Sequence, residues 1–487
     1  MKLTIVGGGT SGLITGLMLK KRFTDTIDIQ VIKSDKIGVI GVGEGSTEHW
    51  NMFANYMGID RFEVIKETGA VFKVGVKYEG WMKNDFMHNV DGQIMDMVHG
   101  QYRLGYGTLI NDNRTNKDYI HKNFWSDNLN HSFVPYQMNF NAAELNKYLL
   151  KLCDRFNIKL ITDEIKDVNM NEDGSIKSLT GKIEYESDFF IDSTGFKKLL
   201  ISKLGAKWQS YSDYILMNEA IAFPTEDTEK YPLYTHIRAM DAGWTWSIPV
   251  WGRWGNGYTF NNNFINADKA QEEVEKKFGK KINIFKNIKF ESGRLDKVWI
   301  KNCVAVGLSA SFIEPLEASA IATSIQQGFL LNHHLTNYNE NTIKVYNDKV
   351  NTINQNILEF ICLCYLVDKN DTDFWKQEFK MPDTLQFKLD IWKNKLPIFE
   401  HFDSKYLLFN ESNFIVALHG RNLLNVENIK KEYMTLPESL RKNAYNNIVD
   451  IMVERQEAED FDHKELISKI REGDDGVEWL KYNQIDT

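Results

Sequence analysis

The first 22 residues, MKLTIVGGGTSGLITGLMLKKR, contain a glycine-rich turn that restricts what the chain can fold into. Residues 3–6 are an apolar run that predicts a strand, and the residues after the glycines predict an amphipathic helix. Gly7, Gly9 and Gly12 stand in the register G-x-G-x-x-G. In this register the first glycine permits a tight turn, the second lets the backbone approach a pyrophosphate, and the third lets the helix pack closely on the strand. The segment therefore predicts a dinucleotide-binding α/β module.

The helix after this turn would present Thr10 and Ser11, with free N–H groups and the positive end of its dipole, to the pyrophosphate. The second predicted strand, IDIQVIKSD at residues 27–35, ends where such modules usually carry an acid that contacts the ribose hydroxyls. Lys33 and Ser34 occupy that place, and Asp35 follows them directly. We therefore expect Asp35 to make the ribose contact.

Two later strands favour FAD over NAD as the nucleotide. DFFIDSTGF, residues 188–196, predicts a strand ending in Asp-x-Thr-Gly, which brings the backbone of Gly195 to the nucleotide. Residues 303–306 predict another strand, followed by Gly307, a loop and a helix whose start can face a flavin ring or an anion. The pattern G-x-G-x-x-G follows no other predicted strand, so we expect no separate NAD(P)H domain and a source of reduced flavin outside this chain.

The stretch GWTWSIPVW, residues 243–251, places three indoles close together. As a strand it directs Trp244, Trp246 and Ile248 to one face and Thr245 and Ser247 to the other. Each buried indole covers a large apolar area, so the paired tryptophans are either core filler or the wall of a cavity. The pattern alone leaves both interpretations open.

Composition excludes several classes of protein. The 487 residues, 43% of them hydrophobic, predict a soluble globular chain of two or three modules, and the net charge of −9 argues against a nucleic-acid partner. The N-terminus offers no signal peptide and no apolar run is long enough to span a bilayer, so we expect a cytoplasmic protein without a membrane partner. The four cysteines match no zinc spacing, which predicts reduced buried thiols and no metal site.

The order of the predicted elements divides the chain in two. Residues 1–340 form an α/β FAD-binding module of Rossmann type, interrupted at about residues 206–290 by alternating segments that predict an antiparallel sheet beside the flavin. From about residue 341 the pattern becomes helical, and residues 341–487 predict a helical cap on the substrate side.

Four motifs in this order resemble the flavin-dependent halogenase family, of which the tryptophan halogenases are the best-known branch. They are GGGTSG at the N-terminus, GVGEGS at residues 41–46, WTWSIP at residues 244–249 and FIEPLEAS at residues 312–319. FKVGVKYEGW, residues 72–81, fits the stretch that carries the family's essential lysine. The resemblance extends from residue 1 to about residue 340.

The resemblance implies a chemistry and two catalytic residues. Reduced FAD, supplied by a separate flavin reductase, would with O₂ and a halide ion give hypohalous acid, which passes through a tunnel to a small aromatic substrate. The family lysine maps to Lys73, with Lys77 as the fallback, and the family glutamate maps to Glu317. A lysine can polarise the hypohalous acid or form a haloamine, and a carboxylate can steer it and remove the ring proton. The structural alternatives are a surface lysine and an acid that stabilises a helix N-terminus.

The family resemblance also implies where the halide binds. Relatives use backbone N–H groups after E-P-L-E, which here belong to Ser319 and Ala320. Relatives usually continue with E-S-T-G, whereas this chain has E-A-S-A, so Ala318 lacks a hydroxyl and Ala320 replaces a glycine. Backbone donors survive these changes, but the halide preference can differ.

The remaining motif residues are assigned by the same resemblance. Glu44, Gly45 and Ser46 would support or contact the cofactor on the flavin side. The tunnel wall facing the flavin would be formed by Trp244, Trp246, Ile248 and Pro249.

On the substrate side, His88 and Phe414 are the candidate contacts, although a loop histidine without catalytic duty is the alternative for His88. The cap segment at residues 407–422 matches the tryptophan-gripping region of relatives only loosely. An indole or a phenol other than free tryptophan is therefore an equal expectation. Oligomeric state is open, and a homo-oligomer is one outcome.

Two other functions share the same flavin fold. A single-component aromatic hydroxylase would normally carry a Gly-Asp pair where this chain has Gly307 and Leu308, and it would consume NAD(P)H itself. An FAD-binding protein without halogenase activity is the second alternative, and the retained Lys73 and Glu317 argue against it.

Overall fold

The computed structural model describes residues 1–36, 38, 44–89, 129–130, 137–402, 404, 406–457, 460–474 and 477. The first three residues of the GVGEGS motif, at 41–43, lie outside this part of the chain.

The nucleotide-binding pattern at the N-terminus folds as predicted, into a mainly parallel sheet. Its strands are β1 (Lys2–Val6), β2 (Asp28–Lys33), β9 (Lys159–Thr162), β13 (Phe189–Asp192), β21 (Trp299–Ile300) and β22 (Cys303–Ala305). They lie in the order β21-β22-β13-β1-β2-β9, and only the short β21 runs antiparallel to its neighbour. The apolar residues of β1 are buried because helices cover the sheet, as a parallel sheet requires.

The helices of this module pack around α1. Helix α1 (Thr10–Phe23) contacts both α6 (Ala142–Arg155) and α8 (Ser319–His334). All but four of the 16 residues of α8 are buried, so this helix forms the interior of the module. Gly328 lies where α8 meets α1, and a Cβ there would come within 2.6 Å of the Met18 sulfur.

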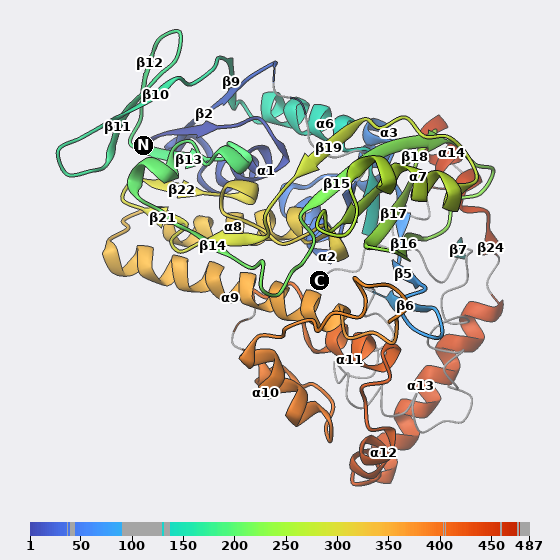
Figure 1. Cartoon of the computed structure of the whole chain (residues 1–487). Coiled ribbons are helices and arrows are strands. Elements are labelled where there is room, and N and C mark those ends of the chain that lie inside the picture. The colour runs from blue at the N-terminus through green and yellow to red at the C-terminus, as the bar shows by residue number, and fades with distance from the viewer. Residues whose placement is uncertain are drawn as a thin grey trace.

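A second sheet lies beside the first (Figure 1). Its strands are β5 (Gly75–Glu79), β6 (Phe86–Asn89), β15 (Glu219–Glu226), β16 (Tyr234–Met240), β17 (Gly243–Val250), β18 (Arg253–Phe260) and β19 (Lys286–Lys289), in the order β19-β15-β18-β17-β16-β5-β6. The part predicted from residues 206–290 is antiparallel, as expected. The sequence did not predict that β5 and β6 extend it through a parallel pairing of β16 with β5, or that helix α7 (Ala267–Phe278) interrupts the same segment.

A small third sheet connects the end of the GVGEGS motif with the lysine segment. It consists of β3 (Glu44–Gly45), β8 (Gln137–Phe140) and β4 (Val71–Lys73), with β8 in the middle. Because β8 pairs with both neighbours, the end of the GVGEGS motif is held beside the lysine segment.

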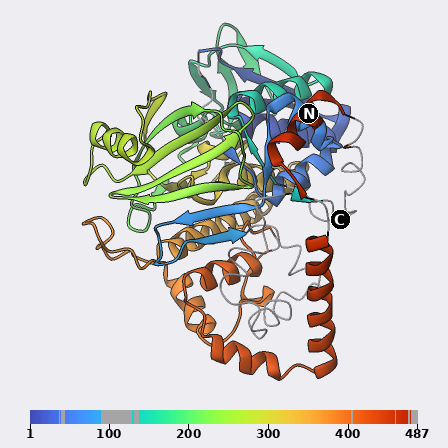
Figure 2. The same ribbon diagram turned by 90° about the vertical axis from the view of Figure 1, so that its right-hand side faces the viewer.

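The C-terminal part is helical, as its sequence pattern predicts. Its helices are α9 (Glu340–Cys364), α10 (Asp383–Trp392), α11 (Glu411–Gly420), α12 (Val426–Met434), α13 (Glu438–Glu457) and α14 (His463–Glu472). In Figure 1, α9 runs below the first sheet toward α10 and α11. The last helix returns to the N-terminal module, where α14 packs on α3 (Arg61–Thr68), and Figure 2 shows it in dark red beside the blue helices.

The described residues also show how the chain stands with respect to membrane spans, metal-binding clusters and disulfides. No helix within the described ranges is long and apolar enough to cross a membrane. The described residues contain no group of three or more His, Cys, Asp or Glu placed to hold a metal ion. The four cysteines are buried and not bonded to one another, which confirms the expectation of buried thiols.

Candidate active site

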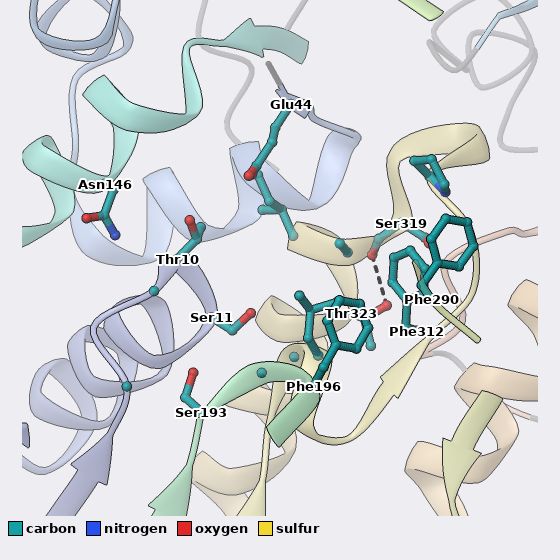
Figure 3. Close-up of a pocket in the computed structure, with 18 of the residues that line it drawn as sticks. Thr10, Ser11, Glu44, Asn146, Ser193, Phe196, Phe290, Phe312, Ser319 and Thr323 are labelled. Carbon is teal, nitrogen blue, oxygen red and sulfur yellow. Dashed lines mark hydrogen bonds between the residues drawn. The ribbon is translucent and has the colours of Figure 1, made fainter. Parts of the chain in front are cut away.

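One cavity of about 630 Å³ connects the glycine turn with the predicted lysine and glutamate. At the nucleotide end it is lined by the predicted residues Gly7, Gly9, Thr10, Ser11, Asp35, Gly195 and Gly307, while Glu44 and Gly45 line it between the two ends. At the other end it is lined by Lys73, Trp244, Trp246, Ile248, Glu317, Ser319 and Ala320. Figure 3 shows Thr10 and Ser11 on the side of α1, with Ser319 across the cavity.

The glycine turn provides a cradle of backbone atoms. Gly7 has a φ of 116°, and a Cβ there would lie 2.0 Å from the Ser193 carbonyl oxygen. A Cβ on Gly12 would lie 2.5 Å from the Gly7 oxygen, whereas a Cβ on Gly9 would meet nothing within 4 Å. The chain thus fills the space at the first and third glycines and leaves it open at the second. Because the N-cap of α1 is Gly9, which has no side chain to cap the helix, the first N–H groups of α1 suit a phosphate of FAD.

Three other residues at the nucleotide end, Asp35, Asn146 and Gly307, differ in exposure and in contacts. Asp35 lines the cavity, but Lys33 forms an ion pair with it, and the Asp35 side chain is 65% exposed. Asn146, which the sequence did not single out, donates from Nδ2 to the Gly8 oxygen at 2.9 Å and faces the cavity (Figure 3). A Cβ on Gly307 would lie 2.1 Å from the Ser11 hydroxyl, so this glycine allows β22 and α1 to approach.

The GVGEGS motif ends between the two halves of the cavity. Glu44 is partly buried at the wall, and this desolvation raises its pKa to about 7. Ser46 does not line the cavity, contrary to its assignment as a cofactor contact. Its hydroxyl accepts from the Met138 N–H at 2.8 Å, and its carbonyl oxygen accepts from Lys73, so it orders β8 and the lysine.

Lys73 is 1% exposed, and the interpretation as a surface lysine is therefore wrong. It ends the short strand β4, and its Nζ donates to the Ser46 oxygen at 2.9 Å. Burial lowers the pKa of Lys73 to about 8, although Glu317 and Glu48 oppose this shift. A Cβ on Gly45 would lie 3.0 Å from the lysine nitrogen, so the absence of a side chain at position 45 leaves room for it. Lys77, the fallback, does not line the cavity.

Glu317 lies directly before α8 with a φ of 64°, a left-handed conformation that non-glycine residues rarely adopt. Its two carboxylate oxygens are each held by a side chain from the second sheet. The Tyr78 hydroxyl donates to Oε1, and His88 Nδ1 donates to Oε2 at 2.7 Å. Burial alone would raise the pKa of Glu317, but the interactions with His88, Tyr78 and Lys73 outweigh burial and lower it.

The two tentative substrate contacts are placed elsewhere. His88 lies on β6, not in a loop; it is 1% exposed and does not line the cavity. Its contact with Glu317 gives it a role that the loop interpretation missed. Phe414 is fully buried in α11, where it packs against Phe360 and Trp392, so it belongs to the core of the cap. The alternating pattern of β6 was too short to predict the strand, and no local pattern pairs residue 88 with residue 317.

The residues predicted to bind the halide lie at the start of α8. Ala318 precedes the helix with a φ of 55° and offers no side-chain cap, so the first N–H groups of the helix are unsatisfied by any cap. Ser319 and Ala320 line the cavity, and Thr323 donates to the Ser319 oxygen at 2.9 Å (Figure 3). Ala320 has an ordinary helical φ, so the fold does not need the glycine that relatives carry there.

The paired tryptophans serve both as core and as wall. Trp244 and Trp246 face the cavity from β17 with ring centroids 5.9 Å apart, as the alternation predicts, and Ile248 follows on the same face. Trp244 is 1% exposed, and its Nε1 donates to the Tyr365 hydroxyl at 2.9 Å. Pro249, the fourth residue of the predicted wall, does not line the cavity.

The fold and this cavity define a class of protein: an α/β enzyme with a dinucleotide cradle that shares one cavity with a buried lysine and glutamate. The chain belongs to the tryptophan halogenase family, because a family model described as Tryptophan halogenase matches residues 2–433. This confirms the resemblance that the four motifs indicated, and with it the assignment to a class of flavin-dependent enzymes.

Individual relatives agree along most of their lengths. Tryptophan 6-halogenase SttH of Streptomyces toxytricini is 28% identical, with 87% of this chain and 90% of that protein covered. Tryptophan 7-halogenase RebH of Lentzea aerocolonigenes is 27% identical, with the same coverage of 87% and 90%. The crystal structure of a tryptophan halogenase from Shewanella frigidimarina superposes with a TM-score of 0.85 at 23% identity, covering 97% of this chain and 98% of that one, which confirms the fold.

Proposed function

We propose that this protein is an FAD-dependent halogenase in which Lys73 and Glu317 direct hypohalous acid onto an electron-rich aromatic ring. The observation that carries the proposal is the single cavity lined by the glycine cradle at one end and by both of these buried side chains at the other. When bound and reduced, FAD supplies with O₂ the oxidising equivalent that converts halide into hypohalous acid. The backbone around Gly9 and Gly195 would hold the cofactor, and the first N–H groups of α8 would hold the halide.

Lys73 can bind the oxidant in either protonation state. With a pKa of about 8, roughly nine in ten Lys73 side chains carry a proton at pH 7. The ammonium form donates to the oxygen of hypohalous acid and polarises its halogen, while the minor amine form can attack the halogen, forming an N–halogen bond as the O–halogen bond breaks and hydroxide leaves. The Ser46 carbonyl oxygen accepts a hydrogen bond from one N–H group of the lysine, and the other N–H groups can contact the oxidant.

Glu317 is held as an anion beside the lysine. Tyr78 and His88 each donate one hydrogen bond to it, and each carboxylate oxygen has a second lone pair that stays available. An anion at this place stabilises positive charge that develops on the ring, and it accepts the proton that leaves when the ring regains aromaticity. A carboxylate with a lowered pKa suffices as the base because a cationic ring intermediate is a strong acid.

The substrate is an aromatic compound of the indole or phenol type. SttH is named a 6-halogenase and RebH a 7-halogenase of tryptophan, and this chain is nearly equally distant from both. Identity at this level supports an aromatic substrate without selecting a ring position. Phe414, which the sequence predicted as a substrate contact in the cap, lies in the core instead. Indoles and phenols that lack the amino-acid group therefore belong in the substrate panel.

The test supplies FAD, a separate flavin reductase, NADH, O₂ and chloride or bromide in turn, with a panel of indoles and phenols. Mass spectrometry is expected to detect a monohalogenated product. Products that carry oxygen instead of halogen, formed without the reductase, would favour the single-component hydroxylase. If no compound of the panel gives a product although the protein still oxidises reduced flavin, the protein would be an FAD-binding protein without halogenase activity.

The matched pair Lys73→Ala and Lys77→Ala tests the site. The two lysines lie on β4 and β5, which follow one another in the sequence, but of the two only Lys73 lines the cavity. We expect Lys73→Ala to oxidise reduced flavin at the normal rate and to halogenate nothing, while Lys77→Ala keeps its product. Full halogenation by Lys73→Ala would disprove the assignment.

A further inference from the structure

A second buried carboxyl lies three residues before Glu317 and lines the same cavity. Glu314 is 1% exposed, and it precedes the short helical turn that carries Glu317. The proposed chemistry of Lys73 and Glu317 makes no use of it. A buried acid in a cavity that handles anions needs an explanation, because an ionised carboxylate there would repel a halide.

Two hydrogen bonds run in sequence from Trp244 through Tyr365 to Glu314. The indole N–H of Trp244 can only donate, so the Tyr365 hydroxyl accepts from it at 2.9 Å. That hydroxyl has a single proton, which it donates to Glu314 Oε1 at 2.8 Å. Oε1 is therefore an acceptor, and a proton on the neutral acid belongs on the other oxygen. Oε2 is buried and has no hydrogen-bond partner in the part of the chain that the structure describes.

The groups facing Glu314 do not compensate a negative charge. Burial raises the pKa of Glu314 to about 8, although the hydrogen bond from Tyr365 opposes this shift. Among the residues that the structure describes, the other titratable groups that interact with it are the thiols of Cys362 and Cys364 on α9. At neutral pH the side chain is therefore a protonated acid that presents an O–H donor at Oε2.

We propose that Glu314 is a hydrogen-bonding station for hypohalous acid between the flavin end of the cavity and Lys73. The Oε2–H group donates to the oxygen of this small neutral molecule, and no covalent step occurs there. The inference rests on the proposed function, since only a halogenase has such a molecule to conduct. Trp244 thereby acquires a positioning role, because its indole N–H fixes the Tyr365 hydroxyl, which in turn fixes the acid.

Two substitutions separate the donor from the mere presence of a side chain. Glu314→Gln keeps a neutral donor and an acceptor for Tyr365, whereas Glu314→Leu has a similar size and neither. The control is Glu273→Gln, because Glu273 also accepts a tyrosine hydroxyl, from Tyr258 at 2.9 Å, and also has a raised pKa, but it lies outside the cavity lining.

The first measurement is the coupling at pH 7, defined as halogenated product per flavin oxidised. Escape of hypohalous acid is followed at the same time with a soluble scavenger, and melting temperature and FAD affinity report on folding. We expect the coupling of Glu314→Gln and Glu273→Gln to stay within about twofold of the wild type. In Glu314→Leu the coupling should fall about tenfold, which is the contribution of one hydrogen bond, and the escape of hypohalous acid should rise correspondingly. Equal coupling in Glu314→Leu and Glu314→Gln, with both folded, would overturn the proposal.

The second measurement remains decisive even if Glu314→Leu does not fold. The coupling of the wild type divided by that of Glu314→Gln is followed from pH 6.5 to pH 9. A group with a pKa of about 8 is roughly nine-tenths ionised at pH 9, so we expect this ratio to fall about tenfold, because glutamine cannot ionise. The pKa of Lys73 depends on burial, Glu317 and Glu48, which both proteins share, so its titration cancels in the ratio.

A ratio that stays constant with pH would overturn the station, and would leave Oε2 as the site of an ordinary structural water. This failure is distinct from failure of the proposed function. If the wild type halogenates nothing in any halide, the function is wrong; if it halogenates and the ratio is flat, only the role of Glu314 is wrong.

Discussion

The two ends of the cavity are built from different parts of the polypeptide. At the nucleotide end the wall is backbone, because glycines keep side chains out where Gly7 meets Ser193 and where Gly307 meets Ser11. At the lysine end the wall is side chains, with Lys73 held by Ser46 beside the third sheet and Glu317 held by Tyr78 and His88 of the second sheet. Substitutions at the first end should therefore act through folding and cofactor affinity, and those at the second through chemistry in a folded protein.

The largest expected effect breaks the backbone wall. In Gly7→Ala the new methyl group would lie 2.0 Å from a carbonyl oxygen, at a φ of 116° that L-residues avoid. We expect the free energy of unfolding to fall by at least about 4 kcal/mol. The new methyl carbon and the Ser193 carbonyl oxygen are both fixed to the backbone, so neither can move aside to relieve the clash. Urea unfolding measures it, and recovery of little folded protein is the same result in stronger form.

Gly9→Ala is the matched control at the same turn. A Cβ there meets nothing within 4 Å, so the stability should stay within about 1 kcal/mol of the wild type, the scale of a changed N-cap. FAD affinity should fall, because the methyl group occupies the space left for the pyrophosphate. Unchanged FAD binding in Gly9→Ala would contradict the assignment of this turn to the cofactor.

The second largest effect is expected at the other end, with the opposite sign for stability. Lys73→Met should reduce halogenation by at least about 10³-fold, since it removes the group that binds the oxidant. It should also raise the free energy of unfolding at pH 7 by about 1–2 kcal/mol, because the cost of burying a charge disappears while one hydrogen bond to Ser46 is lost.

The pH dependence of stability gives this prediction a sign. The pKa of Lys73 falls from 10.5 in the unfolded chain to about 8 in the folded protein. Between these values the unfolded chain binds more protons, so the contribution of Lys73 makes the wild type more stable as the pH rises from 8 to 10.5. Lys73→Met should lack this contribution in urea unfolding at a series of pH values. An identical pH dependence in both proteins would mean that the lysine titrates normally.

The same contrast explains what the sequence could and could not predict. The cradle lies within one strand, turn and helix, so the spacing of Gly7, Gly9 and Gly12 predicted its position and the close backbone contacts at the first and third glycines. Lys73 and Glu317 were found only through family motifs, since no local pattern shows that residues 244 positions apart share a cavity. Tyr78 and His88 were missed as partners of Glu317 because the pairing of β5 with β16 and of β6 with β5 brings them there.

A third prediction concerns these two partners. His88→Gln and Tyr78→Phe each remove a group that lowers the pKa of Glu317, and His88 has the larger influence. In both variants the pKa of Glu317 should rise, so that halogenation is lost at a higher pH as the solution is acidified, with the larger displacement in His88→Gln. We expect kcat/KM at pH 7 to fall about tenfold in each.

The control for the tyrosine is Tyr346→Phe, another fully buried tyrosine whose hydroxyl donates to the Gln327 oxygen at 3.4 Å, away from Glu317. It should leave the acid limb of the pH profile in place. If His88→Gln and Tyr78→Phe lose activity without moving that limb, the two residues support the fold of the site and do not set the charge of Glu317.

The smallest expected effect lies between the two ends, at the tryptophan wall. Trp246 packs on Gly257, where a Cβ would lie 2.1 Å from the indole, and its own side chain is only partly buried. Trp246→Ala removes wall without breaking the hydrogen bond that Trp244 donates to Tyr365, so halogenation should remain the main reaction. Aromatic substrate could then approach the flavin, and a minor hydroxylated product should become detectable by mass spectrometry.

Trp244→Phe sharpens this test because it keeps an aromatic wall and removes only the indole N–H. It should form no hydroxylated product, but its coupling should decrease two- to threefold, about the effect of one weakened hydrogen bond. If both variants gave the wild-type products and coupling, the paired tryptophans would be core residues alone, and separation of substrate from flavin would have to come from distance along the cavity.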